Sequence, residues 1–336
     1  MKILITGGAG FLGSEIVNKI IFTKNIELTV IDNLSRGYLQ RINKSINKFK
    51  FINADINNLN KLKLPKFDWI IHSSAIAPLP DNQCNHLNSI VSNIAQCGSI
   101  VDFCIKSGTK NVIFFSSSAV YEKQIKKPFN EIITKPPTLM YATSKYLAEK
   151  YFDSVVKSYK INVISLRLAN IYGRNQDYFR KQVPFLGYLI KNTLNKRDLI
   201  LFAKGNYKRD YLFIDDLIEL IFKILKYKKF SNKHYIFNLG SGDAYSVLDF
   251  LKLIKKITKI KPKVVWGNKK NYWNKYDELY NSKLKLDKKL IKEEVEKKVI
   301  LNNNKIRKFF KWKPKTNIVE GLKECIKHAK KIVLIK

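Results

Sequence analysis

Short runs of β-branched and aromatic residues alternate with amphipathic patterns through the first half of the chain. The apolar runs predict strands over Lys2–Thr6, Glu27–Ile31, Phe49–Asn53, Trp69–His72, Asn111–Ser116 and Asn162–Leu168. Between them, apolar positions three and four residues apart predict helices over about 11–22, 86–106 and 139–158. Alternation of this kind favours a parallel sheet with helices on both faces, so we expect an α/β, doubly wound fold.

The regular alternation ends near residue 169, where glycine and proline begin to divide the chain into shorter elements. A further helix pattern and strand pattern within 207–239 could return to the sheet. We therefore expect residues 1–169, joined by 207–239, to form the sheet domain. Residues 170–206 and 240–336 would form a smaller, mixed lobe. The stretch 267–298 is dense in Lys, Asn and Tyr, and we expect a mobile surface segment there.

Composition excludes several classes of protein. The chain has 336 residues, of which 45% are apolar and 27% charged, which is enough for a large core and excludes global disorder. No apolar run approaches the roughly 18 residues of a membrane span. Glycines follow the first strand too early for a signal peptide, so we expect a cytoplasmic protein without a membrane partner. The four cysteines and four histidines show no metal-ligand spacing, which predicts reduced thiols and no metal site.

The formal net charge of +36 raises the possibility of a nucleic-acid partner. The basic residues, however, include only eight arginines, the residue type that reads base edges and phosphates with two bonds. The lysines are scattered in ones and twos along the whole chain. Lys, Asn and Ile share A/T-rich codons, so a nucleotide-biased genome accounts for all three excesses together. We expect no specific nucleic-acid site.

A glycine motif follows the first predicted strand directly. Residues 7–13 read Gly-Gly-Ala-Gly-Phe-Leu-Gly and open the first predicted helix. Glycines in this context permit a tight turn and a close approach of pyrophosphate to the helix N-terminus. Asp32 ends the second predicted strand, where a carboxylate accepts ribose hydroxyls and repels a 2′-phosphate. The pattern predicts an NAD site; a structural turn with an ordinary strand-end Asp is the alternative, and the nearby Arg36 is the one feature that favours NADP.

A candidate base lies in the third helical pattern. Tyr141 and Lys145 are four residues apart and share one helix face. An ammonium beside a phenol favours the phenolate, which makes Tyr141 usable as a base near neutrality. Ser117, at the end of the fifth strand, could hydrogen-bond the same substrate hydroxyl. Because Tyr-x-x-x-Lys is common by chance, the prediction depends on its position after the glycine motif, Asp32 and the serines.

These motifs resemble those of the extended short-chain dehydrogenase/reductase family, the NAD-dependent sugar-nucleotide epimerases and dehydratases of the UDP-glucose 4-epimerase type. The resemblance extends over nearly the whole chain and includes Ala54-Asp55-Ile56, His72-Ser73-Ser74-Ala75, Arg167–Gly173, Arg209-Asp210-Tyr211 and Trp312-Lys313-Pro314. It implies a Rossmann fold, NAD as cofactor, and a homodimer paired through the helices predicted at 86–106 and 139–158.

The resemblance also assigns roles to individual residues. The catalytic set would be Tyr141, Lys145 and Ser117. The NAD site would consist of Gly7, Gly10, Phe11, Leu12, Gly13, Asp32, Asn33, Asp55, Ile56, Ser74, Tyr141 and Lys145. The substrate, a UDP-linked sugar nucleotide, would contact Ser117, Ser118, Asn170, Phe202 and Arg209. A guanidinium suits the diphosphate. The chain departs from the family at Arg174, where Pro is usual, and late in the chain, where Lys298 and Asn302 replace an Arg and an Asp.

Within the family that the chain resembles, the two residues after the catalytic hydroxyl distinguish the reactions. The 4,6-dehydratases have an acidic pair there, because elimination of water needs an additional acid and base. This chain has Ser118 and Ala119. The resemblance therefore implies epimerisation of a UDP-sugar at C4 through a transient 4-keto intermediate. A 4-keto reductase or dehydrogenase and a 4,6-dehydratase stay open as alternatives. A non-catalytic relative that binds RNA or another anionic partner is the alternative from another class.

Overall fold

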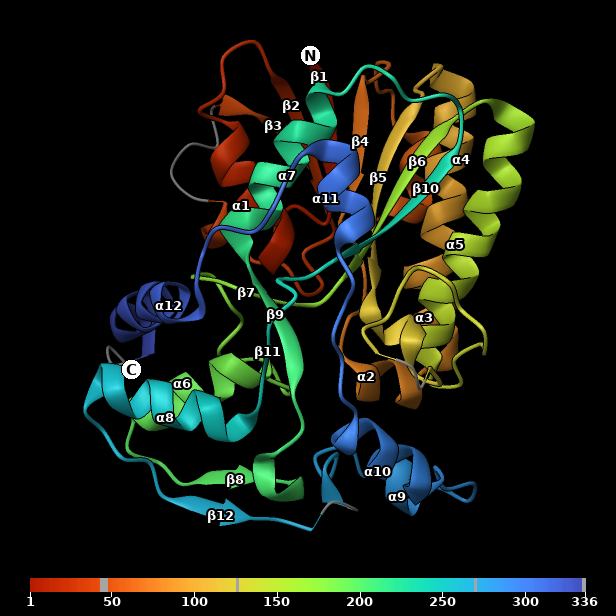
Figure 1. Cartoon of the computed structure of the whole chain (residues 1–336). Helices are drawn as coiled ribbons and strands as arrows, with labels where there is room; N and C mark the ends of the chain where they lie inside the picture. The colour runs from red at the N-terminus through yellow and green to blue at the C-terminus, as the bar shows by residue number, and fades with distance from the viewer. Residues whose placement is uncertain (43–47, 125–126, 269–270, 334–336) are drawn as a thin grey trace.

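The computed structural model describes residues 1–42, 48–124, 127–268 and 271–333. Its largest element is a seven-stranded sheet in the order β10-β6-β5-β4-β1-β2-β3, parallel throughout (Figure 1). The strands are β1 (Lys2–Thr6), β2 (Glu27–Asp32), β3 (Lys50–Asn53), β4 (Trp69–His72), β5 (Asn111–Ser117), β6 (Asn162–Leu168) and β10 (His234–Leu239). The doubly wound parallel sheet predicted from the sequence is confirmed, and all six predicted strands are present within a residue of their expected ends.

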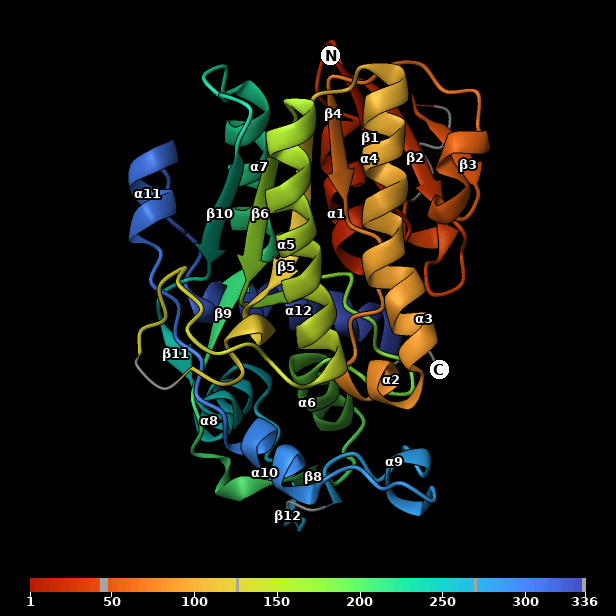
Figure 2. The same ribbon diagram turned by 90° about the vertical axis from the view of Figure 1, so that its right-hand side faces the viewer.

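Helices cover both faces of this sheet. Figure 2 shows α4 (Gln96–Ser107) and α5 (Met140–Tyr159) on one face, where their apolar sides close a core with β1, β4 and β5. On the other face lie α1 (Phe11–Ile20), α7 (Ile214–Lys226) and α11 (Asn304–Phe310). The apolar side of α7 is almost entirely buried against α1 and the sheet, which explains why this helix returns from the second half of the chain.

One predicted helix is divided. The pattern over 86–106 forms α3 (His86–Ile90), a π-helical turn (Val91–Ala95) and α4. Asn93 lies in the turn and is 1% exposed. Its Oδ1 accepts from the Ile76 amide at 3.0 Å and its Nδ2 donates to the Ser144 hydroxyl at 3.2 Å. A buried side chain that bonds two other segments accounts for the irregular turn, and such turns often occur at functional sites.

The second lobe contains two small sheets. One has the order β11-β9-β7 and the other pairs β12 with β8. The strands are β7 (Asn170–Tyr172), β8 (Leu199–Leu201), β9 (Arg209–Phe213), β11 (Ala244–Tyr245) and β12 (Val264–Trp266), and the helices include α6 (Phe185–Leu194), α8 (Val247–Thr258) and α12 (Ile318–Val333). Of the returning segment 207–239, α7 and β10 join the main sheet layer, whereas β9 pairs with β7 in the second lobe.

The stretch expected as a mobile surface segment, 267–298, has a buried side instead. It contains α9 (Glu278–Asn281) and α10 (Lys288–Glu296). Its described apolar residues pack against Leu139 and Ala142 at the start of α5; the buried ones are Trp273, Tyr276, Leu279, Ile291 and Val295. Aromatic and aliphatic residues spaced among the lysines make this buried stripe, which the high polarity of the segment concealed. Leu79 and Cys84, on α2 (Leu79–Cys84), also contact it.

Two further findings concern function classes. In the part of the chain that the structure describes, no helix is long and apolar enough to cross a membrane. Across the same residues, no group of three or more His, Cys, Asp or Glu side chains is placed to hold a metal ion. All four cysteines are free thiols, and Cys97 and Cys104 are buried on one side of α4.

Candidate active site

The carboxyl ends of the central strands open into a cleft of about 670 Å³ between the sheet and the second lobe. The predicted site residues that line it are Gly10, Phe11, Leu12, Ser117, Ser118, Tyr141, Lys145, Asn170 and Arg209. Parallel α/β sheets bind ligands at this edge, because the loops that follow the strands gather there. A second cavity of about 420 Å³ contains the predicted residue Phe202 and shares Asn170 and Arg209 with the cleft.

Tyr141, Lys145 and Ser117 come together in the middle of the cleft. Tyr141 lies in the first turn of α5 and hydrogen-bonds the Ser117 side chain at the end of β5. Lys145 lies one turn further along α5 and is 3% exposed. Its Nζ donates to the Phe115 carbonyl at 2.9 Å. The Ser117 hydroxyl oxygen accepts from the Ala119 amide at 3.1 Å, which fixes its position beside the phenol.

The electrostatics of Tyr141 differ from the expectation in one respect. Burial raises the pKa of the phenol, while the Ser117 hydrogen bond and the positive charge of Arg180 lower it, and the net shift is upward. The sequence predicted that Lys145 would be the group that lowers this pKa. Instead, the Lys145 ammonium lies on a main-chain carbonyl, and burial lowers its own pKa to about 8. In this structure Ser117 and Arg180 therefore favour the phenolate.

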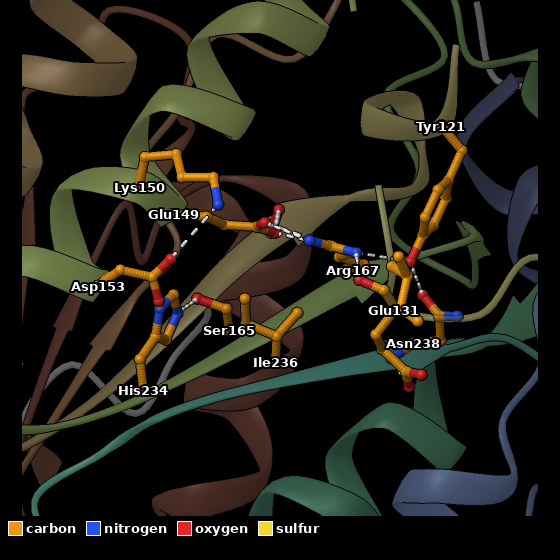
Figure 3. A network of polar contacts seen from close by, with 12 residues as sticks. Tyr121, Glu131, Glu149, Lys150, Asp153, Ser165, Arg167, His234, Ile236 and Asn238 are labelled. Carbon is orange, nitrogen blue, oxygen red and sulfur yellow. Dashed lines mark hydrogen bonds and ion pairs between the residues drawn. The ribbon is translucent and has the colours of Figure 1, made fainter. Parts of the chain in front are cut away.

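A buried ion pair anchors the strands beneath this trio (Figure 3). Arg167 on β6 and Glu149 on α5 are 3% and 2% exposed at their side chains and are joined at 2.6 Å. The Tyr121 hydroxyl accepts from Arg167 at 2.8 Å and donates to Asn238 on β10 at 2.6 Å. Ser116, the neighbour of Ser117, donates to the same Glu149 at 2.6 Å. The network ties α5, β5, β6 and β10 together, so the base and its serine are held by rigid elements.

The glycine loop has the shape that a dinucleotide pyrophosphate needs. Gly7 has a φ of +67°, and a Cβ there would lie 2.6 Å from the main chain of Ser74. A Cβ at Gly13 would lie 2.2 Å from the Gly7 carbonyl oxygen, so a side chain at either position would disrupt the loop. Gly10 begins α1 without a side-chain cap, which leaves the first amides of the helix directed at the cleft. These residues fit NAD.

Asp32 has a structural contact on each oxygen. Its Oδ2 accepts from the Ala9 amide at 2.9 Å and its Oδ1 from the Leu34 amide at 2.8 Å. A carboxylate has about four lone-pair sites, so both oxygens can still accept from ribose hydroxyls. Asp32, Asn33, Asp55 and Ile56 are not among the lining residues of the cleft. They lie around the ends of β2 and β3, where Asn33 donates to Asp55 at 2.9 Å.

A pair of buried polar residues lies beneath the glycine loop. Thr6, the last residue of β1, hydrogen-bonds His72, the last residue of β4, at 2.8 Å. His72 is 1% exposed, and burial, together with the nearby Lys145 charge, lowers its pKa to about 3. The imidazole is therefore neutral at physiological pH.

The opposite end of the cleft is made of side chains from the second lobe. Arg209 on β9 pairs with Glu294 on α10 at 3.2 Å. The Lys297 ammonium lies 3.8 Å from Glu294. In the adjoining cavity, Phe202 meets the Tyr272 ring edge to face, with ring centres 5.3 Å apart. An aromatic cavity beside two cations suits a nucleoside diphosphate.

Sequence reasoning missed several of these residues. Glu294, Lys297, Gln176 and Arg180 line the cleft but belong to no motif. The sequence comparison with the family pointed to Lys298 at this end of the site, but the lysine that lines the cleft is its neighbour Lys297. The scarcity of arginine could have served as a signal, because four of the eight arginines line this one cleft: Arg36, Arg41, Arg180 and Arg209.

Comparisons with known proteins agree with this geometry. Residues 3–240 match the model of the NAD dependent epimerase/dehydratase family. A UDP-glucose 4-epimerase of Thermotoga maritima, solved with UDP-glucose, is 26% identical with a TM-score of 0.83, over 98% of this chain and 99% of that chain. The UDP-glucose 4-epimerase of Lactobacillus helveticus is 27% identical over 77% of this chain and 82% of its own length. A dTDP-D-glucose 4,6-dehydratase of Dictyostelium discoideum is 32% identical over 76% of this chain and 62% of its own length.

Proposed function

The chain belongs to the NAD dependent epimerase/dehydratase family, and we propose that it interconverts the two C4 epimers of a UDP-linked sugar, with NAD as its cofactor. The observation that carries this proposal is the hydrogen-bonded pair of Tyr141 and Ser117, set beside Lys145 in the cleft that the glycine loop also lines. A binding protein without catalysis has no use for a half-buried phenol positioned in this way.

Tyr141 moves the proton in the proposed reaction. When bound, NAD supplies reversible hydride transfer at the sugar C4. Tyr141 accepts the proton of the C4 hydroxyl as this carbon is oxidised and returns it to the same oxygen as the carbon is reduced on its other face. Ser117 orients the C4 oxygen through its hydroxyl. Hydride and proton both return to the sugar, so the reaction involves no net oxidation.

The carboxylates of the cleft support epimerisation over dehydration. Elimination of water needs a free acid and base near the sugar. The carboxylates that line the described cleft are Asp177 and Glu294, and each is paired with an arginine, Arg41 at 3.6 Å and Arg209 at 3.2 Å. Glu122, the acidic residue next along the chain from Ser117, instead accepts from the Thr138 hydroxyl and the Leu139 amide at 2.6 and 2.8 Å.

The substrate end has the chemistry of a nucleoside diphosphate site. We propose that Arg209 and Lys297 hold the diphosphate, because both cations line the cleft on the side away from the glycine loop. Phe202 and Tyr272 would enclose the base in the aromatic cavity. Asn170, which lines both spaces, and Ser118 would hold the sugar.

We also propose that two copies pair through α3 and α5. These helices expose large apolar side chains on one side of the molecule, with exposed fractions of 72% at Leu87, 43% at Ile90 and 45% at Leu147. Exposed apolar residues grouped on neighbouring helices are typical of subunit interfaces. The variant Leu87→Glu with Leu147→Glu should shift a dimer to a monomer in light scattering. A wild-type protein that is monomeric at micromolar concentration would contradict this pairing.

A panel of sugar nucleotides tests the proposed function. The purified protein is incubated with UDP- and dTDP-linked hexoses, N-acetylhexosamines and hexuronates, and the products are separated by chromatography. We expect one UDP-sugar to be converted to its C4 epimer until equilibrium, without added NAD. A 4-keto-6-deoxy product would show that the enzyme is a dehydratase.

A further inference from the structure

The loop between β7 and α6 passes over the N-terminus of α1. At its start, a Cβ on Gly173 would lie 3.4 Å from the Phe11 ring. The Asn175 amide donates to Glu15 on α1 at 3.2 Å. Asp177 pairs with Arg41 at 3.6 Å. These contacts hold the loop against α1 beside the glycine motif, where Gln176 and Arg180 line the cleft.

The loop also carries a buried amide without a hydrogen-bond partner among the described residues. Gln176 is 4% exposed and lines the cleft. Neither its Oε1 nor its Nε2 has a hydrogen-bond partner in the described structure. A buried amide without partners is costly, so a native protein rarely keeps one unless a ligand completes it. The missing partner must offer both an acceptor and a donor, as a phosphate oxygen next to a ribose hydroxyl does.

The same loop carries a guanidinium without a carboxylate of its own. Arg180 lines the cleft, and burial lowers the pKa of its guanidinium, although the negative charges of Asp177 and Asp81 act to raise that pKa. Each of these carboxylates already pairs with another arginine, Asp177 with Arg41 and Asp81 with Arg36. The Nε of Arg180 donates to the Gln182 carbonyl, and among the described residues its Nη groups have no hydrogen-bond partner. The Nη edge is thus available to an anion.

We propose that Gln176 and Arg180, together with the N-terminus of α1, bind the pyrophosphate of NAD and its adjoining ribose. A dinucleotide pyrophosphate carries two negative charges, and a helix N-terminus offers about half a positive charge. Arg36 is engaged by Asp81, and Arg209 lies at the other end of the cleft beside Glu294. Arg180 therefore supplies the missing charge, with two donors for two phosphate oxygens. The inference rests on the NAD site of the proposed function, and its consequence is that the loop retains the cofactor between turnovers.

Cofactor exchange tests the proposal without any substrate. The purified protein is mixed with excess isotope-labelled NAD, and the label in bound cofactor is followed by mass spectrometry. Loss of a charge-assisted pair should make exchange in Arg180→Gln about 10–100-fold faster than in the wild type. Arg180→Lys, which keeps the charge and loses the second donor, should lie between the two. Arg197→Gln removes an exposed arginine outside the cleft and should exchange at the wild-type rate.

A second variant separates binding from folding. Gln176→Met has a similar shape and removes the unpartnered amide, so NAD exchange should become several-fold faster. After charcoal removes the cofactor, the same variant should unfold at the wild-type temperature or above it. A lower unfolding temperature with unchanged exchange would show that Gln176 serves the fold and would overturn its assignment.

Because the charge of Arg180 acts on Tyr141, Arg180 could instead contact the sugar, which is the alternative to NAD binding. If Arg180 recognises an anionic group on the sugar, Arg180→Gln should raise KM for a UDP-hexuronate and leave NAD exchange unchanged. That result would overturn the proposal. If no UDP-sugar is converted by the wild type, the proposed reaction fails, but the exchange rates still decide whether Arg180 binds NAD.

Discussion

The two ends of the cleft are built by different means. At the cofactor end, seven consecutive residues form the turn after β1 and the start of α1, and the groups expected to bind the cofactor are largely main-chain amides at the start of α1. At the substrate end, the lining comes from segments far apart in sequence, among them β9, the segment after β8 and α10. The groups proposed to bind the substrate are side chains. One of the acidic side chains there, Glu294, forms an ion pair with Arg209.

This difference explains why the cofactor can be predicted from the fold, whereas the substrate depends on individual side chains. A main-chain cradle binds any dinucleotide that fits, so the cofactor follows from local sequence. A side-chain site changes its ligand with each substitution, so the sugar nucleotide also depends on residues outside any motif, such as Glu294 and Lys297. Tyr141 lies between the two ends, and in the proposed reaction it acts on the oxygen of the sugar carbon that exchanges hydride with the cofactor. Variants at the cofactor end, at the substrate end and at Tyr141 should therefore have different effects.

The largest effect is expected where the two ends meet. Tyr141→Phe keeps the ring and removes only the hydroxyl, so the fold and the NAD content should persist. General acid–base steps contribute about 10²–10⁴ in rate, and kcat should fall at least that far. Tyr146→Phe, on the same helix, provides the matched control and should stay active. Full activity in Tyr141→Phe on a confirmed substrate would remove the basis of the site.

The next effect should be confined to the substrate end. Arg209→Gln should raise KM for the UDP-sugar about 10–100-fold through the lost charge-assisted bonds, with NAD content unchanged. Because it removes one of the two cations that pair with Glu294, it should also lower the free energy of unfolding by about 1–3 kcal/mol. Adding Glu294→Gln should restore stability and leave KM high. If the double variant recovers wild-type KM, Arg209 does not hold the diphosphate.

The contrast between a cofactor end built from consecutive residues and a substrate end built from distant segments also explains what the sequence could predict. The strands, the helices and the glycine loop follow from local patterns, because β-branched runs, helix periodicity and a tight turn each act over a few residues. The burial of Trp273 and Tyr276 could not be predicted, because the partner surface at Leu139 lies more than 130 residues earlier in the sequence and the segment is polar on average. The pairing of Arg209 with Glu294 was missed for the same reason. The placement of Lys145 on the Phe115 carbonyl depends on the depth of α5 against the sheet, which no spacing reveals.

A smaller effect should be confined to the cofactor end. Asp32→Asn removes the charge that we expect to face the adenosine ribose, so it should weaken NAD binding by about 1–3 kcal/mol. It should also narrow the preference for NAD over NADP, because the repulsion of a 2′-phosphate is lost. Asp102→Asn, an exposed carboxylate on α4, is the control. Equal affinity of the wild type for NAD and NADP, measured by calorimetry, would contradict the role of Asp32.

The smallest effect concerns stability beneath the glycine loop. The unfolded chain protonates a histidine below about pH 6.5, whereas folded His72 resists protonation to about pH 3 because it is buried. Between these values the unfolded state binds the additional proton, so stability falls as the pH falls, by at most about 1.4 kcal/mol per pH unit. Urea unfolding at pH 7 and pH 5 should show a weaker loss in His72→Asn than in the wild type. The exposed His86→Asn should behave as the wild type; equal losses in all three proteins would place the acid sensitivity elsewhere.

The central claim is that the sugar C4 gives up a hydride and takes the same hydride back on its other face within one closed site. A UDP-sugar deuterated at C4, incubated in ordinary water and followed by mass spectrometry and NMR, tests it directly. The account predicts that the epimer keeps its deuterium at C4 while the Tyr141 proton exchanges freely with water. An epimer that has lost its deuterium to solvent would mean inversion by proton abstraction from carbon, and would contradict the role assigned to NAD and to Tyr141.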